Sequence, residues 1–125
     1  MIYKTLGAVV QGIDHLIPNS YPAEEKIRWL SSFDGRIYEE IFLPHDGAPR
    51  SFLPYEMGDL GRSMLVPEPY GMELYLAYLE NTMDHYNGDT ARYNNSLDRL
   101  ANSYREFAGW YHRNHRPIGK TRRFW

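Results

Sequence analysis

The feature that most constrains this chain is an unbroken spacing of apolar and Tyr side chains between residues 72 and 111. Steps of three and four residues repeat without a phase slip, which is the period of an α-helix. Eleven of the twelve positions are apolar or Tyr, and Thr90 is the exception; the positions are Met72, Leu76, Leu79, Met83, Tyr86, Thr90, Tyr93, Leu97, Leu100, Tyr104, Phe107 and Tyr111. This part of the chain is therefore predicted to be helical.

Two interpretations of the pattern remain open. A single helix of about 40 residues would be roughly 60 Å long at 1.5 Å per residue, whereas a compact domain of this size has a radius of gyration near ~14 Å. Asn87 and Gly88, followed by Asp89 or Thr90 as an N-cap, are instead typical of a break between two antiparallel helices. We favour two helices, 71–87 and 89–115, with one kinked helix as the alternative.

Proline placement limits the other helices, because a proline inside a helix removes a hydrogen bond and clashes with the preceding turn. Five of the eight prolines lie between residues 44 and 69. Helices are therefore predicted on the N-terminal side of that segment, over residues 5–17 and 22–42. Thr5 is the expected N-cap of the first helix, and Gly35 marks a kink or a point of close packing in the second.

Residues 43–70 are predicted to form an extended arm or a short β-hairpin. Two short apolar pieces, Ser51–Leu53 and Met64–Val66, have strand-like composition and are separated by turn signals. A connection of this length without regular structure usually has a function, such as gripping a neighbouring molecule. The alternative is a loop that simply covers the core.

Length and composition predict one globular domain spanning residues 1–125, and the helical segments above make it mainly α-helical, a small bundle of about four helices. The chain is 42% hydrophobic and 24% charged, which is typical of globular proteins. It contains no cysteine, so disulfides, thiolate metal sites and cysteine nucleophiles are excluded. Eleven Tyr exceed the eight Phe and Trp together, and Tyr suits protein interfaces as well as cores.

The charge of the chain is divided unevenly. Residues 105–125 carry a net charge of +5 (6 − 1), and residues 1–104 carry −7 (8 − 15). Residues 116–125 are predicted to form an extended tail in which cations and large aromatic side chains, the types enriched at binding hot spots, occur together. A frayed terminus is the alternative. The candidate binding residues of the tail are Ile118, Lys120, Arg122, Arg123, Phe124 and Trp125.

No motif for catalysis or for a cofactor is present in the sequence. The Gly58–Gly61 segment lacks the Lys-Ser/Thr pair of a phosphate-binding loop. His112 and His115 lie one helical turn apart, but no motif supplies the further ligands that zinc needs. Adjacent acid–base pairs such as Asp14-His15 rarely give catalytic geometry. We therefore predict no enzyme, metal, cofactor or membrane-spanning segment.

Several phrases, taken in order, resemble one family of viral structural proteins. They are PNSYP, EEKIRWLSSFDGRIYEEIF, SMLVPEPYGMELYLAYLE and YNGDTARYNNSLDRLANSYREFAGWYHRNHRP. From about Leu6 to Pro117 the chain is similar to the head-to-tail connector (adaptor) proteins of tailed phages and prophages. The likeness lies in segment order and local phrases and not in one diagnostic motif.

The resemblance implies a non-enzymatic virion protein at the head–tail interface, present in the host cytoplasm during assembly. Copies of the chain would form a ring under the portal protein and prolong the DNA channel, with DNA passing through without sequence-specific binding. The tail, Ile118–Trp125, would dock on the portal. The arm would contact neighbouring copies or the next tail component, a stopper or tail terminator. The arm residues expected at that contact are Phe52, Leu53, Tyr55, Met64, Leu65 and Val66.

Two alternative functions follow from the same features. One is a non-structural phage protein, such as an assembly chaperone or a packaging accessory factor. The other is a small nucleic-acid-binding helical module, in which the basic tail tracks phosphates while Phe124 and Trp125 stack on bases. The acidic body disfavours the second, and it suits a channel that repels phosphate so that DNA slides.

Overall fold

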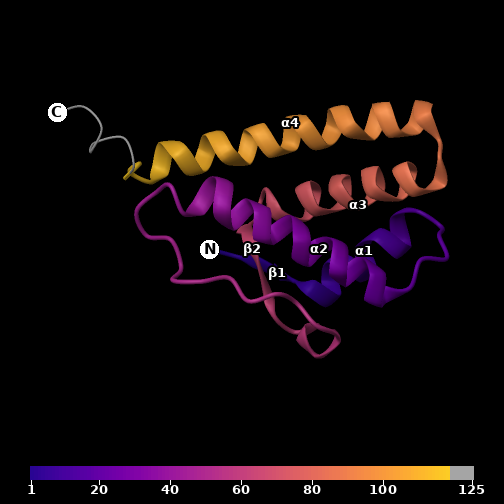
Figure 1. Ribbon diagram of the computed structural model, residues 1–125, viewed down its shortest axis with the longest axis horizontal. Helices are drawn as coiled ribbons and strands as arrows, with labels where there is room; N and C mark the ends of the chain where they lie inside the picture. Colours follow the sequence, from indigo (N-terminus) through magenta and orange to yellow (C-terminus); the bar gives the residue numbers. More distant parts are fainter. Residues whose placement is uncertain (119–125) are drawn as a thin grey trace.

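The computed structural model describes residues 1–118, and within them four α-helices and one two-stranded antiparallel sheet form the fold. The predicted mainly α-helical class is confirmed. Figure 1 shows α4 lying along α3 and reaching past it over the end of α2, with the sheet and the arm on the side of α2 away from α4. The helical elements are α1 (Leu6–Leu16), α2 (Ala23–Ile37), the π-helical turn η1 (Tyr38–Phe42), the 3-10 turn η2 (Met57–Asp59), α3 (Gly71–Asn87) and α4 (Thr90–Asn114).

The starts of α1 and α4 follow from capping side chains. The Thr5 hydroxyl accepts a hydrogen bond from the Ala8 amide at 3.1 Å, which satisfies a backbone donor that the first turn leaves free. The Asp89 carboxylate accepts one from the Arg92 amide at 3.0 Å. Gly88 ends α3 with a φ of +72°, a left-handed conformation that glycine adopts without strain. The two-helix interpretation is therefore confirmed.

The reversal at Gly88 changes which side chains of the long repeat are buried. On α4 the buried positions are Ser96, Ser103, Phe107 and Tyr111, whereas Leu97 is 39% exposed. Phe107 and Tyr111 of the repeat are therefore core residues, whereas Leu97 of the same repeat lies at the surface. An antiparallel turn gives each helix its own inward face, so the phase of α3 does not carry over into α4.

The sheet pairs the arm with the N-terminus of the chain. Strand β1 (Tyr3–Thr5) runs antiparallel to β2 (Ser63–Pro67), with Tyr3 opposite Pro67 and Thr5 opposite Ser63. The predicted hairpin partner, residues 51–53, has no regular structure. Pairing with β1 places β2 beside the start of α1, where its buried side chains join the core.

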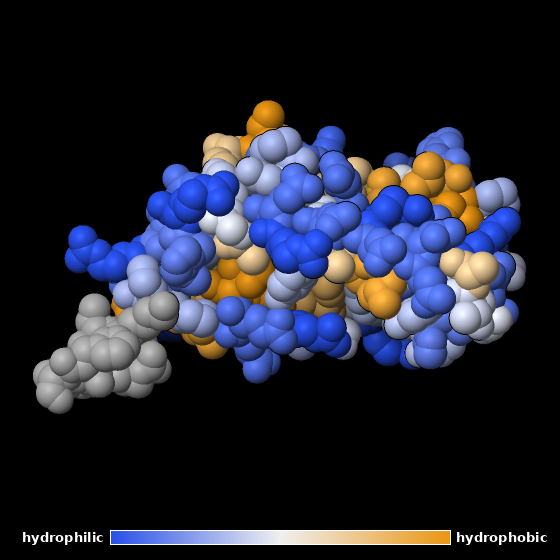
Figure 2. All heavy atoms as spheres, turned by 90° about the horizontal axis from the view of Figure 1, so that it is seen from above, coloured by the Kyte–Doolittle hydropathy of each residue, from blue (hydrophilic) through white to orange (hydrophobic). Residues whose placement is uncertain are grey.

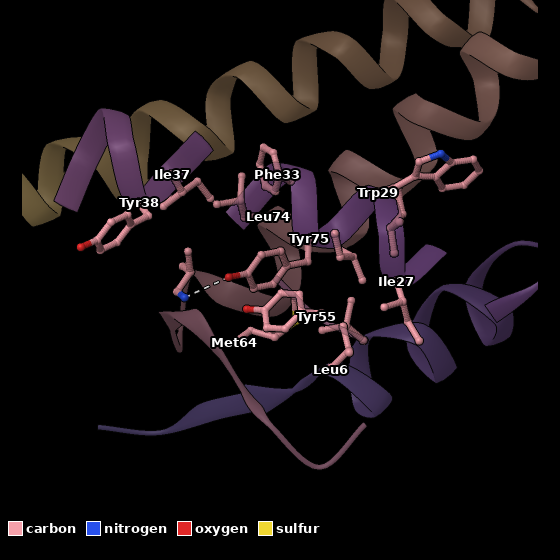
Figure 3. Packing of buried hydrophobic residues seen from close by; sticks show 14 of the residues in the cluster. Leu6, Ile27, Trp29, Phe33, Ile37, Tyr38, Tyr55, Met64, Leu74 and Tyr75 are labelled. Carbon is pink, nitrogen blue, oxygen red and sulfur yellow. Dashed lines mark hydrogen bonds between the residues drawn. The ribbon is translucent and has the colours of Figure 1, made fainter. Parts of the chain in front are cut away.

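One hydrophobic core draws on all four helices, on the arm and on β2. Figure 3 shows part of it, with side chains from α1, α2, α3, the arm and β2. The face of α2 that carries Leu30, Phe33 and Ile37 lies against α1 and α3. The ring of Phe42 in η1 stacks on the Tyr111 ring of α4 at 4.6 Å between centroids. Within residues 1–118, no helix combines the length and apolar character needed to cross a membrane.

Candidate functional site

A buried carboxylate holds the arm against the helices. Asp34 of α2 is fully buried, and its Oδ1 accepts a hydrogen bond from the Tyr75 hydroxyl of α3 at 2.6 Å. Its Oδ2 accepts from the Tyr55 hydroxyl of the arm and, at 3.2 Å, from the Leu65 amide of β2. The Tyr75 hydroxyl also accepts from the Val66 amide at 2.9 Å (Figure 3). We call these residues the Asp34 hub; it joins α2, α3, β2 and the arm.

Burial sets the acid–base properties of the hub. Removal from water raises the pKa of Asp34 to about 6, although the hydroxyls of Tyr55 and Tyr75 and the Leu65 amide act in the opposite direction. Burial, and then the nearby Asp34 charge, raise the pKa of both tyrosines above their ordinary value. Both hydroxyls therefore stay protonated and serve as donors to the carboxylate.

Arg62 makes a second attachment between distant parts of the arm. Its Nη2 donates to the Leu53 carbonyl at 2.6 Å and its Nη1 to the Pro54 carbonyl at 3.3 Å. The guanidinium carbon lies 4.7 Å from the centre of the Tyr55 ring and 5.6 Å from that of Phe52, a cation–π arrangement. Arg62 therefore fixes residues 52–55 beside the turn that precedes β2.

Three of the six predicted arm contacts are buried in the chain's own core. Tyr55 is 6% exposed, Met64 2% and Val66 0%. Their assignment as contacts to a neighbouring copy is therefore wrong for this conformation. The physical reason is the Asp34 hub, which draws the arm onto the bundle and uses these side chains as core.

The other predicted arm residues remain at the surface to different degrees. Leu53 is 67% exposed, while Phe52 and Leu65 are half-buried. Two exposed apolar side chains on the same arm were not predicted: Met57 is 50% exposed and Leu60 is 43% exposed. We call Leu53, Met57 and Leu60 the arm tips. The sequence signal for Met57 and Leu60 was that each stands directly before a glycine of the turn segment, Gly58 or Gly61.

An open groove of about 950 Å³ runs along the outer side of α2, beside the arm. We call it the α2 groove. Its carboxylates come from α2, η1 and the arm, and its apolar lining comes mostly from the arm, together with Ile27 of α2. The charged residues of its lining are Glu24, Glu39, Glu40, Glu56, Arg28 and Arg36, and the apolar arm residues are Phe52, Pro54, Tyr55 and Met57.

Gly35 lies in the floor of this groove, where the Phe52 ring covers it. A Cβ at Gly35 would be 3.6 Å from the nearest ring carbon of Phe52, an ordinary contact distance. The helix has no break at this residue. Neither a kink nor close packing therefore requires this glycine.

The first part of the predicted tail is anchored to the segment after η1. The Asp46 amide donates to the Arg116 carbonyl at 2.8 Å, and the Ile118 amide donates to the Pro44 carbonyl at 2.9 Å. His45 and Pro117 form an antiparallel bridge between them. Of the predicted portal-binding residues, Ile118 belongs to this base of the tail; the remaining ones lie outside the described residues. They are Lys120, Arg122, Arg123, Phe124 and Trp125.

The histidines near the end of α4 take part in aromatic packing. His45 Nδ1 lies 2.6 Å from the Ile41 carbonyl oxygen, and His45 Nε2 lies 3.1 Å from His112 Nδ1. The His115 ring stacks on Tyr111 with 3.7 Å between centroids. Among residues 1–118, no group of three or more side chains is arranged to hold a metal ion.

In two of the adjacent acid–base pairs, Asp14-His15 and Asp84-His85, the acidic member has another partner. Asp14 Oδ1 accepts from the Lys26 ammonium at 2.6 Å, and Lys26 is 2% exposed. Asp84 accepts from the Ser96 hydroxyl at 2.8 Å in the interface of α3 and α4. Both contacts join helices and thereby support the fold.

Comparison with known proteins identifies no relative of this chain. No family model, curated protein or solved structure matches the chain. The surfaces described above are therefore interpreted from their own chemistry. Seen from the α4 side, the surface is mostly hydrophilic with separate apolar patches (Figure 2).

Proposed function

We propose that this protein is a head-to-tail connector subunit of a tailed phage or prophage. Its copies assemble as a ring under the portal protein, and each copy docks on the portal through its basic and aromatic C-terminal tail. The order of sequence phrases given above supports the proposal. The function is structural, and no catalytic step is part of it.

The observation that carries the proposal is the anchored base of the tail. Hydrogen bonds to residues 44 and 46 fix the chain as far as Ile118, so the seven residues that follow start from a set position on the molecule. In a ring, such tails reach the portal from equivalent positions. Modest individual contacts then combine, because linked sites raise the effective concentration of each further contact.

The attachment of the arm supports a role in contacts between copies or with the next tail component. The Asp34 hub and Arg62 hold the arm so that Leu53, Met57 and Leu60 are presented at little further cost in conformational entropy. Exposed apolar side chains on a fixed support are typical of protein interfaces. We assign the subunit contact to these arm tips in place of the buried arm residues.

The charge of the described residues supports passage of DNA without adhesion. Residues 1–118 contain 11 Lys and Arg and 16 Asp and Glu, a formal net charge of −5 (11 − 16). A ring of such subunits repels phosphate, and this repulsion disfavours the tight binding that would stop a duplex from moving through the channel.

The test is binding of the purified full chain to assembled portal protein from the same genome. Saturable binding is expected, and a variant that lacks residues 119–125 should lose it while keeping the same helical circular dichroism. Arg113→Ala is the matched control, because Arg113 is an exposed cation on α4 outside the tail. Retention of binding by the shortened chain would contradict the tail assignment.

Two companion measurements separate the alternatives. A connector remains in purified virions, whereas an assembly chaperone or packaging factor is absent from them, so particle proteomics distinguishes these classes. A nucleic-acid-binding module would bind duplex or single-stranded DNA with an affinity that falls steeply with salt. Such binding, abolished by Arg122→Ala with Arg123→Ala, would replace the connector proposal.

A further inference from the structure

The α2 groove has the chemistry to bind a basic, aromatic peptide. Four glutamates and two arginines line it, which gives a formal charge of −2. Arg28 is bound to Glu25 at 2.9 Å, so Arg36 is the other cation of the lining. The Glu40 carboxylate accepts a hydrogen bond from the Tyr104 hydroxyl at 2.6 Å, and the Glu56 carboxylate accepts one from the Asp59 amide. Phe52, Pro54 and Met57 of the arm supply an apolar wall beside them.

The chain itself contains a peptide of the complementary type. The seven residues after Ile118 are GKTRRFW, with three cations, no acidic side chain and two large aromatics. Opposite charge favours encounter with the groove, and the aromatic pair suits its apolar wall.

The path of the described chain leads toward the groove. Residues 116–118 pair antiparallel with residues 46–44, so the described chain ends at Ile118 while running in the direction from Asp46 toward Leu43 and η1. Glu39 and Glu40, which line the near end of the α2 groove, belong to η1. The η1 end of the groove is therefore four to five residues along the chain from Pro44, to which Ile118 is hydrogen-bonded.

We propose that the α2 groove binds the C-terminal tail, residues 120–125, of the same chain. An extended stretch from Lys120 to Trp125 spans about 17 Å at about 3.3 Å per residue. That length equals about 11 residues of helix at 1.5 Å each, enough to run from Glu40 to the neighbourhood of Arg28. The cations lie along the glutamates, and Phe124 and Trp125 lie against the arm wall.

This contact controls when the tail is available for assembly; this regulatory role rests on the connector proposal. A tail bound to its own groove is unavailable to other partners until a portal competes for it. Free copies then stay unassembled, and docking on the portal empties the groove. Binding within one chain requires no portal, so it is measured on the protein alone and its failure leaves the portal proposal untouched.

The experiment is paramagnetic relaxation enhancement on the full chain. Because the chain contains no cysteine, Thr121→Cys provides a single site for a nitroxide label. The amide signals of Ser32 and Gly35, which line the groove, should lose intensity. Asn95, exposed on α4, should keep its intensity. Losses confined to residues around Pro44 would overturn the proposal.

Two controls show which copy of the chain supplies the bound tail and whether the contact is electrostatic. In a mixture of ¹⁵N-labelled chain without nitroxide and unlabelled chain with nitroxide, the groove signals should be unaffected; their loss would mean that another copy supplies the tail. Raising the salt from about 0.1 M to about 1 M shortens the screening length from about 10 Å to about 3 Å, and Glu39→Lys reverses a groove charge. Both should restore intensity at Ser32, whereas Glu106→Lys, on exposed α4 surface, should not.

Discussion

Replacing Asp34 by Asn is expected to remove a pH dependence of stability that the native protein shows between about pH 4 and about pH 7. Asn has nearly the same shape but does not titrate. The free energy of unfolding of the native protein, measured relative to that of Asp34→Asn, should therefore fall as the pH rises through this window.

The magnitude follows from the two pKa values of the carboxyl group. Its ordinary value is 3.8, and burial raises it to about 6 in the folded protein. Between these values the folded protein keeps a proton that the unfolded chain has released, so stability is highest at low pH and is lost as the pH rises. This difference in pKa corresponds to about 3 kcal/mol. Between acid and neutral pH, the free energy of unfolding of the native protein should therefore fall by this amount relative to that of Asp34→Asn.

Urea denaturation followed by circular dichroism at several pH values measures this difference. The comparison of native protein with variant cancels the titration of all groups that the two chains share. Asp98→Asn, which alters an exposed carboxylate on α4, should show a far smaller pH dependence. A difference that is constant, or that grows in favour of the native protein with pH, would refute the reasoning, because the hydroxyl and amide donors would then dominate over burial. If Asp34→Asn does not fold, Tyr55→Phe tests the same hub by removing one donor.

Three further predictions concern the fold. Gly71→Ala should destabilise the protein by about 1–3 kcal/mol in urea denaturation, because its Cβ would lie 2.4 Å from the Val66 carbonyl oxygen; Gly61→Ala, with nothing within 4 Å, should be near neutral. Arg62→Leu should release the arm carbonyls and speed limited chymotrypsin cleavage in residues 51–57, and unchanged cleavage would contradict the role assigned to Arg62. Ser96→Ala should cost about 1–3 kcal/mol in thermal or urea unfolding, since it leaves two polar side chains of α3 without their shared partner.

The helices were predictable because their determinants are local. The periodicity, the cap at Thr5 and the Gly88–Asp89 break all act within a few residues of the boundary they set. The predicted bounds of the four helices therefore agree with the structure to within one residue at most ends, although the last turn of the second helix is π-helical.

The contacts of the arm were not predictable in the same way, because they join residues far apart in the sequence. Nothing near Met64–Val66 indicates that residues 3–5 are its partner. One signal for the hub was nevertheless available. Asp34 falls between Leu30 and Ile37 on the apolar face of its helix, a position where a carboxylate needs buried donors.

The two surfaces left for assembly differ in physical character, and that difference allows them to be measured separately. Contacts through Leu53, Met57 and Leu60 depend on burial of apolar surface, which ordinary salt does not screen. Contacts through the tail depend on its cations, and exposed charges are screened progressively as salt rises. Moderate salt should therefore release the tail, from its own groove or from the portal, while contacts between copies persist; simultaneous loss of both would mean that the arm tips do not join the subunits.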